Sequence, residues 1–219
     1  MVRNDGLLVN IILDRSGSMA GLENDVIGHF NSYIEELRYL PNDVHVSLFL
    51  FDHEYEQVYI NRPVKEVPVL SADTYFVRGS TALLDAVGRT IRSVDAIPNK
   101  PNKVIFVINT DGYENASKEF TKKQIKADIT ERQANHDWQF VFIGAGIDAF
   151  AEAGGLGIKA YSTLGTASTP DGIKSGYYNL TNSTVNYANN TSSFMDMTVT
   201  TSVEEEEGKK KKVTSGASS

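Results

Sequence analysis

Short, nearly continuous apolar runs alternate along the chain with longer segments in which apolar residues recur every three or four positions. The runs "LLVNIIL" (7–13), "KVIFVIN" (103–109) and "WQFVFIG" (138–144) predict strands that are buried on both faces. A further short strand is predicted near "IKAYS" (158–162). The segments between the strands predict helices, at 19–41, 80–98, 121–133 and 147–155.

Two more strands, "VHVSLFLF" (44–51) and "YEQVYI" (55–60), are separated only by "DHE", which predicts an antiparallel hairpin. Elsewhere each strand is followed by a helix, and this alternation predicts parallel strands covered by helices. The expected fold class is therefore α/β: a doubly wound, mostly parallel central sheet with one antiparallel edge strand and helices on both faces. Ligands of such sheets bind beyond the carboxyl ends of the strands.

The composition shifts toward Ser, Thr, Asn and Gly after Ser162. Thr169 followed by Pro170 predicts the start of one more helix, since Thr is a good cap and Pro fits the first turn. The final residues hold too little apolar surface to fold. We therefore expect an α/β domain over 1–165, a packed helical extension over 166–195 and a disordered low-complexity tail over 196–219. That tail contains an acidic block, Glu204–Glu207, and a basic block, Lys209–Lys212.

Composition narrows the possible functions. The 219 residues carry a formal net charge of −7, which argues against nucleic acid as a partner because binding would require a basic surface. The chain has no cysteine, which excludes disulfides and thiol catalysis. Its apolar runs are too short to span a membrane, and no signal-peptide cleavage pattern follows the first of them. We expect a soluble, cytoplasmic protein without a membrane partner.

Small oxygen-bearing side chains gather at the ends of three apolar segments. Asp14, Ser16 and Ser18 follow the first strand in "DRSGSM", Thr81 precedes a helix in "GSTALLDA", and Asp111 follows a strand in "NTDG". Carboxylate and hydroxyl oxygens without His or Cys suit a hard cation such as Mg²⁺, or Mn²⁺. The alternate spacing from residue 14 to residue 18 would let one tight loop present three side chains to such an ion.

These three motifs together resemble the metal-ion-dependent adhesion site of von Willebrand factor A domains, over roughly residues 5–160. The resemblance implies that Ser16, Ser18 and Thr81 ligate the ion directly, and that Asp14 and Asp111 hold it directly or through water. The stretches "GSTALLDAVGRTI" and "VIFVINTDGYENAS" are most similar to the intracellular bacterial and phage members. That similarity implies a scaffold or adaptor working beside an ATPase, or else a phage virion component.

Two carboxylates against a divalent cation would leave the site almost neutral, with one coordination position open to a third carboxylate from a protein partner. We therefore expect a non-enzymatic, Mg²⁺-dependent protein-interaction module that binds an acidic residue of its partner. Arg15 is expected to add a charge-assisted hydrogen bond to the same carboxylate. In the alternative interpretation the ion only ties the three loops together.

The main enzymatic alternative is an aspartyl-phosphate phosphotransferase or phosphatase, since Asp14 follows a central strand and would work with Mg²⁺. Such enzymes need a second carboxylate two positions later, and that position is Ser16. "GAGIDA" (144–149) has the spacing of a dinucleotide-binding turn but follows the last long strand, which favours an ordinary strand-to-helix turn. Asp85 lies one helical turn beyond Thr81, so we expect it to support the loop by hydrogen bonds and not to ligate metal.

Overall fold

Six strands form one sheet in the computed structural model, which describes residues 6–136 and 138–198. The order across the sheet is β3-β2-β1-β4-β5-β6, and only β3 runs antiparallel to its neighbour. The predicted mostly parallel sheet with one antiparallel edge strand is therefore confirmed. The strands are β1 (Leu7–Asp14), β2 (Val44–Phe51), β3 (Tyr55–Pro63), β4 (Lys103–Thr110), β5 (Gln139–Ala145) and β6 (Thr163–Thr166).

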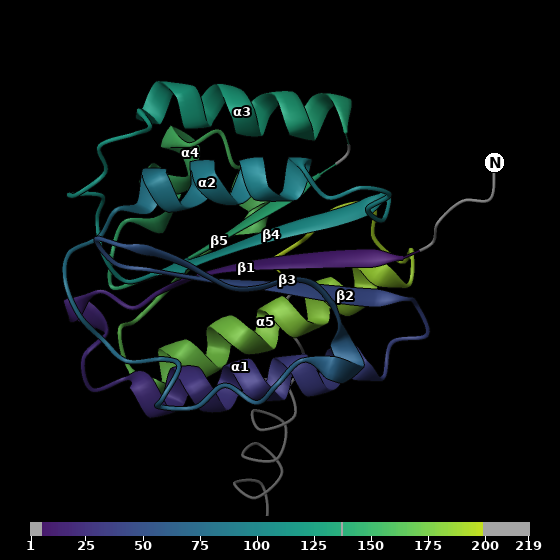
Figure 1. Ribbon diagram of the computed structural model, residues 1–219, viewed down its shortest axis with the longest axis horizontal. Helices are drawn as coiled ribbons and strands as arrows, with labels where there is room; N and C mark the ends of the chain where they lie inside the picture. Colours follow the sequence, from purple (N-terminus) through teal and green to yellow (C-terminus); the bar gives the residue numbers. More distant parts are fainter. Residues whose placement is uncertain (1–5, 137, 199–219) are drawn as a thin grey trace, which may run out of the picture.

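Helices cover both faces of the sheet (Figure 1). On one face lie α1 (Glu23–Arg38) and α5 (Pro170–Ala188), and on the other α2 (Leu83–Asp95), α3 (Lys122–Asn135) and α4 (Ala149–Gly155). Three short 3₁₀ helices complete the described elements: η1 (Gly17–Met19), η2 (Val64–Glu66) and η3 (Ala160–Ser162). None of the described helices is long and apolar enough to cross a membrane.

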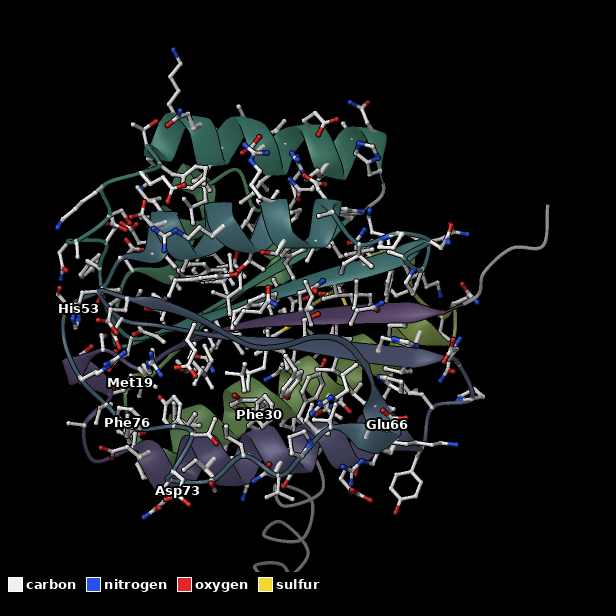
Figure 2. The ribbon with its side chains drawn as sticks, in the orientation of Figure 1. Met19, Phe30, His53, Glu66, Asp73 and Phe76 are labelled. Carbon is white, nitrogen blue, oxygen red and sulfur yellow. The ribbon has the colours of Figure 1, made fainter. Side chains whose placement is uncertain are left out.

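The central strand β1 shows why the apolar runs are continuous. All eight of its residues are buried, and successive side chains alternate between the two faces. Leu7, Val9, Ile11 and Leu13 pack with α1 and α5, where Phe30 lies between α1 and the sheet (Figure 2). Leu8 and Ile12 pack with α2 and α3 on the other face. A strand with helices on both sides therefore has no polar face, except at its ends.

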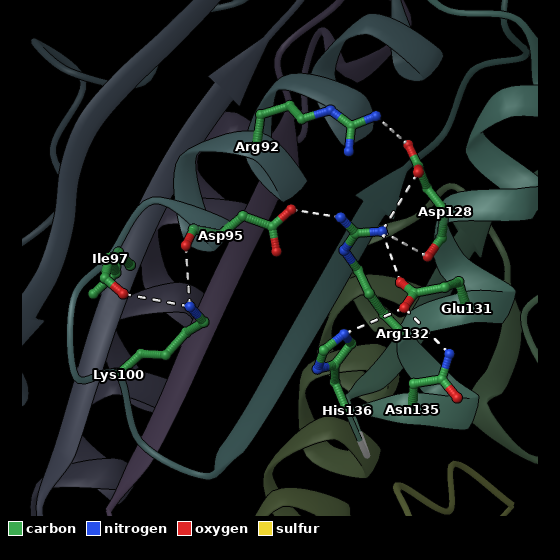
Figure 3. Close-up of polar contacts among 9 residues, drawn as sticks. All are labelled: Arg92, Asp95, Ile97, Lys100, Asp128, Glu131, Arg132, Asn135 and His136. Atoms are coloured by element: carbon green, nitrogen blue, oxygen red, sulfur yellow. Dashed lines mark hydrogen bonds and ion pairs between the residues drawn. The ribbon is translucent and has the colours of Figure 1, made fainter.

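At the carboxyl ends of α2 and α3, a group of ion pairs fastens the two helices together (Figure 3). The Arg132 guanidinium donates to Asp95 at the end of α2, and Arg92 donates to Asp128 on α3 at 2.7 Å. Arg132 is mostly buried and its guanidinium also lies over the ring of Trp138, at 5.6 Å from its centre. These contacts fix the ends of the helices that lie away from the carboxyl edge of the sheet.

The last strand differs from its predicted position. Residues 158–162 cross from α4 to the sheet edge and contain η3, and the strand follows at Thr163–Thr166, paired with β5. Ile158 explains the shift, because its N–H donates to the Ala153 carbonyl at 2.9 Å and its side chain is buried against the α2–α3 face. That residue closes the end of α4, so pairing with β5 begins later.

The predicted C-terminal helix is present as α5. The Thr169 hydroxyl accepts from the Gly172 N–H, Pro170 stands in the first turn, and the helix packs beside α1, where the Tyr33 and Thr184 hydroxyls lie 3.0 Å apart. Packing continues beyond residue 195, the predicted end of this segment. Met197 is buried and its N–H donates to the Tyr161 carbonyl at 2.7 Å. Residues 199–219, most of the predicted disordered tail, lie outside the described residues.

Candidate metal centre

The sheet brings the predicted motifs to one edge. Strand β1 lies between β2 and β4, and Asp14 is the last residue of β1 while Asp111 directly follows β4. Because parallel strands end at the same edge, two carboxylates that are 97 positions apart in sequence lie side by side in space. In Figure 2 the labelled residues Met19, His53 and Phe76 mark this end of the molecule.

Four of the five predicted ligands are linked by hydrogen bonds. The buried Asp14 carboxylate accepts from the Ser16 N–H at 2.7 Å through Oδ1, and from the Thr110 hydroxyl at 2.5 Å through Oδ2. The Ser18 hydroxyl donates to the Asp111 carboxylate at 2.5 Å and lies 3.2 Å from the Ser16 hydroxyl. The two serines and the two aspartates therefore face one another at the sheet edge.

Thr81 completes the set from the loop before α2. A Cβ atom at position 112 would lie 2.7 Å from the Thr81 Oγ1 and 3.4 Å from the Ser18 Oγ. The Thr81 and Ser18 hydroxyls therefore converge on the same small space, which stays open because residue 112 is glycine. A methyl group at position 112 would fill this space. The space and the oxygen donors around it fit a divalent cation.

The electrostatics of the site also favour a cation. Burial raises the pKa of Asp14 from 3.8 to about 6, against hydrogen bonds from Thr110 and Ser16 that lower it, and the nearby Asp111 raises it further. Burial likewise raises the pKa of Asp111, while hydrogen bonds from Ser18 and Ser168 lower it. Both carboxylates are therefore costly to ionise on their own, and a bound cation would stabilise their ionised forms.

The donor set is made of oxygen atoms alone. Within residues 6–136 and 138–198, no group of three or more His, Cys, Asp or Glu side chains converges in a way that could hold a metal ion. A metal at this edge would therefore depend on the hydroxyls of Ser16, Ser18 and Thr81. Hydroxyl and carboxylate ligands favour a hard ion such as Mg²⁺ over softer metals.

Supporting residues, which the sequence motifs do not reveal, hold the loops in place. The Thr81 N–H donates to the Asn115 side chain at 2.9 Å, and the Asn115 N–H donates back to the Thr81 carbonyl at 3.0 Å. The Glu114 carboxylate accepts from the N–H of Leu84 in the first turn of α2 and from two N–H groups of its own loop. The only signal for them in the sequence is the polar run that follows β4.

Asp85 supports a loop by hydrogen bonds, as predicted, but the loop is the one between β4 and α3 and not the predicted one that carries Thr81. Its carboxylate accepts from three consecutive backbone N–H groups, those of residues 118, 119 and 120, at 2.8–2.9 Å. These bonds lower its pKa below the usual value against the opposing effect of burial. The side chain is thus committed to the loop between β4 and α3.

Arg15 does not take the predicted role. Its side chain is 1% exposed, with Nε donating to Asp52 at 2.9 Å and Nη1 donating to Glu56 at 2.6 Å. The expectation that it reaches a partner's carboxylate is therefore wrong. The physical reason is that the Arg15 N–H continues the pairing with β2, by donating to the Phe51 carbonyl, and its side chain packs on the β2–β3 side.

Asp52 is the centre of this second polar group. Besides Arg15, its buried carboxylate accepts from Arg78 at 2.8 Å and lies 3.0 Å from the His53 ring. The Phe76 ring lies 5.5 Å from the Arg15 guanidinium and 5.6 Å from that of Arg78. Three segments are joined in this way: the loop after β1, the β2–β3 turn and the loop before α2.

The "GAGIDA" segment forms a strand-to-helix turn. Gly146 has a positive φ of 69° and its N–H donates to the Thr166 carbonyl, which ties the turn to β6. Asp148 then caps α4 by accepting from the Ala151 N–H. The helix it opens has seven residues. The backbone groups of the turn are thus used within the fold, as the strand-to-helix interpretation predicts.

We expect Asn115→Ala to weaken metal binding several-fold without unfolding the protein, because it removes the acceptor that positions Thr81. Asn115→Asp keeps a side-chain oxygen at that position and serves as the matched control. Calorimetric titration with Mg²⁺ measures the binding, and a thermal melt confirms folding. Equal Mg²⁺ affinity for Asn115→Ala and the natural chain would show that the backbone alone positions Thr81.

Comparison with known proteins identifies the fold. No model of a protein family matches the chain, and no curated protein sequence matches it. Among solved structures, the vWF domain of the type V pili tip protein Mfa5 from Porphyromonas gingivalis is similar with a TM-score of 0.61 at 13% identity, over 85% of this chain and 96% of that one. The PilB minor pilin from Streptococcus sanguinis has a TM-score of 0.62 at 13% identity, over 84% and 62%.

A third similar structure is proximal thread matrix protein 1 from the mussel byssus, in a form described as having a zinc-occupied MIDAS motif. Its TM-score is 0.61 at 13% identity, and the match covers 84% of this chain and 47% of that one. The chain thus spans less than two thirds of the minor pilin and of the byssus protein. At this identity the likeness concerns the fold, and the fold of this chain is that of a von Willebrand factor A domain.

Proposed function

We propose that this chain is a protein-recognition module that binds Mg²⁺ or Mn²⁺ through Asp14, Ser16, Ser18, Thr81 and Asp111, and through the ion an acidic side chain of a protein partner. The observation that carries the proposal is that Thr81 and Ser18 both face the space left open by Gly112, and that Ser18 contacts Ser16 and Asp111 through its hydroxyl. The von Willebrand factor A fold supports it, since the similar byssus protein is described with a zinc-occupied MIDAS motif.

The charges of the donor set suit this role. Asp14 and Asp111 supply two negative charges, which balance a divalent ion, while Ser16, Ser18 and Thr81 add neutral oxygens. A sixth, carboxylate ligand from outside would therefore meet little net repulsion. When bound, the ion supplies an open coordination position for that ligand.

Aromatic side chains beside the centre fit a protein partner. Tyr113, next to Gly112, is 51% exposed, and Phe76, in the loop before α2, is 46% exposed. Large aromatic side chains are enriched in protein interfaces because they bury much apolar area and lose little conformational freedom. If an acidic residue of the partner bound the ion, the partner residues next to it would contact these two rings.

The environment of Asp14 supports recognition over catalysis. A nucleophilic carboxylate needs an accessible oxygen, whereas the Asp14 side chain is fully buried and both of its oxygens accept hydrogen bonds. The four histidines contact groups outside the five proposed ligands: His29 the Tyr177 ring, His45 the Asn61 carbonyl, His53 Asp52, and His136 Glu131. We therefore propose that the module is not an enzyme. Magnesium-dependent phosphate release that disappears in Asp14→Asn would restore the phosphotransferase alternative.

From the motif resemblance we further propose a bacterial or phage protein that acts in the cytoplasm as an adaptor for an ATPase-associated complex. The second candidate is a phage structural protein in which the ion only stabilises the loops. The hydrogen bond from Ser18 to Asp111 favours this second role, because it already joins two of the loops that the ion would hold.

Partner capture tests the proposal. We expect affinity purification with this chain to lose its partner in chelator and to recover it when Mg²⁺ is restored. Thr81→Ala should reduce capture at least tenfold with little effect on folding, whereas Thr81→Ser keeps the hydroxyl and should retain capture. If chelator lowers the melting temperature and leaves the captured partner in place, the ion is structural only and the recognition role is refuted.

A further inference from the structure

Helices α1 and α5 lie side by side on one face of the sheet (Figure 1), and a groove of about 790 Å³ runs between them. Pockets that hold small ligands have volumes of about 300–1,000 Å³. Along α5 the groove extends from Asp171 to Asn182, about 16 Å of helix at about 1.5 Å per residue. None of the five proposed metal ligands lines it, so the groove is a site separate from the metal centre.

Buried aromatic side chains hold the two helices together at the floor of the groove. The Tyr177 ring lies 6.3 Å from the rings of both His29 and Tyr33, measured between ring centres. The Tyr33 hydroxyl lies 3.0 Å from that of Thr184. Tyr33 and Tyr177 are buried, whereas Tyr178 also lines the groove and is 45% exposed. The groove therefore has well-supported walls that carry several aromatic rings.

The lining of the groove is polar throughout. Every described side chain that lines it carries a nitrogen or oxygen atom, and none is aliphatic. The side chains of Glu36, Asp171 and Lys174 make no hydrogen bond or ion pair with any described residue. The Nδ2 atom of Asn182 is buried and has no partner within the described part of the chain, so turning this amide toward the groove would cost no hydrogen bond. The groove thus offers unused donors and unused acceptors together.

We propose that this groove binds a neutral oligosaccharide. Each sugar hydroxyl both donates and accepts hydrogen bonds. It can therefore accept from Lys174 or Asn182 and donate to Glu36 or Asp171. The apolar C–H faces of the sugar rings can pack on the tyrosine rings, which combine an apolar body with a polar tip.

The charges of the lining favour a neutral ligand over an anion. Glu36 and Asp171 carry two negative charges and Lys174 one positive charge, so an acidic ligand would meet net repulsion. An apolar helix or a lipid would bury these same groups without partners, which costs free energy. A polyhydroxylated ligand leaves none of them unpaired.

The experiment titrates the full chain with three neutral trisaccharides: maltotriose, cellotriose and tri-N-acetylchitotriose. Saturation-transfer NMR detects binding and calorimetry measures the affinity. We expect at least one trisaccharide to bind with a dissociation constant of about a millimolar or tighter. The affinity should be the same in Mg²⁺ and in chelator, and the acidic trisaccharide trigalacturonate should bind more weakly.

Substitutions in the groove locate the site. Tyr178→Ala and Asn182→Ala should each weaken sugar binding about fivefold, with thermal melts confirming that both proteins fold. Tyr39→Ala is the matched control for the first, since Tyr39 is 76% exposed and lies outside the groove. Asn179→Ala is the control for the second, because Asn179 is on α5 but its amide donates to the Ser175 carbonyl and does not line the groove.

Three results would overturn the inference. They are no binding of any neutral trisaccharide at about 10 mM, equal affinity in the groove variants and their controls, and tighter binding of trigalacturonate than of the neutral sugars. Loss of sugar binding in chelator would overturn it as well, because it would place the sugar at the metal centre. Failure of this inference leaves the proposed function untouched, since that function depends on the metal centre alone.

Discussion

Replacing Asp14 with asparagine is expected to abolish Mg²⁺ binding and at the same time to make the metal-free protein more stable at pH 7. The carboxylate is fully buried and its pKa is raised from 3.8 to about 6. In the absence of metal, its ionisation therefore costs folding free energy, on the order of 3 kcal/mol above pH 6. Asparagine removes both this cost and the charge that a cation needs.

The substitution fits the site. Asparagine Oδ1 can accept from the Ser16 N–H as the carboxylate does. Its Nδ2 can donate to the Thr110 oxygen, whose own proton can then turn to the Gly112 carbonyl, 3.2 Å away. No buried polar group loses its hydrogen-bond partner, so the change in the free energy of unfolding measures the effect of the Asp14 charge.

The pH dependence has a definite sign. The folded metal-free protein binds the Asp14 proton more tightly than the unfolded chain does, so its stability falls as pH rises from about 4 to about 6 and stays low above that. Urea unfolding in chelator at pH 5 and pH 7 should show this contribution in the natural chain and not in Asp14→Asn. The exposed Asp73, in the loop before α2, gives the matched control Asp73→Asn. A less stable metal-free Asp14→Asn protein, or unchanged Mg²⁺ binding, would contradict the assignment.

The second large effect is expected at Asp52. We expect Asp52→Ala to lower the free energy of unfolding by about 3–5 kcal/mol, because it leaves the buried Arg15 guanidinium without its buried partner. Arg78 would lose one of its two ion pairs as well. Urea unfolding in chelator measures the loss without any contribution from metal.

Glu54→Ala is the control, since Glu54 pairs with the same Arg78 but is exposed. Its loss should cost less than about 1 kcal/mol. Combining Asp52→Ala with Arg15→Met should recover part of the stability, because the pair is then replaced by apolar groups. An Asp52→Ala protein as stable as Glu54→Ala would show that water replaces the missing carboxylate and that Arg15 is less enclosed than the structure indicates.

The amino-acid sequence by itself determined the first five strands, most of the helices and the proposed ligands. A strand between two helical layers buries both faces, so "LLVNIIL" and "KVIFVIN" are unmistakable as continuous apolar runs. A helix cap acts over three residues, which is why the Thr169 cap could be predicted from the sequence. The chemistry of Asp14, Ser16 and Ser18 is likewise local, because one loop carries all three.

Only the tertiary structure decided which strands are neighbours, and with them the contact between the loops. Placing β1 between β2 and β4 brings Asp111 to Ser18 and leaves Asp52 beside Arg15. Arg15 shows what the sequence could not predict. Its position between two proposed ligands suggested that it would bind a partner's carboxylate, yet Asp52, 37 residues away, holds its side chain inside the fold. Asn115 and Thr110 likewise form hydrogen bonds with residues that are distant in sequence, Thr81 and Asp14. The local pattern of apolar residues indicates whether a side chain is buried. The residue that it contacts depends on how strands far apart in sequence are ordered in the sheet.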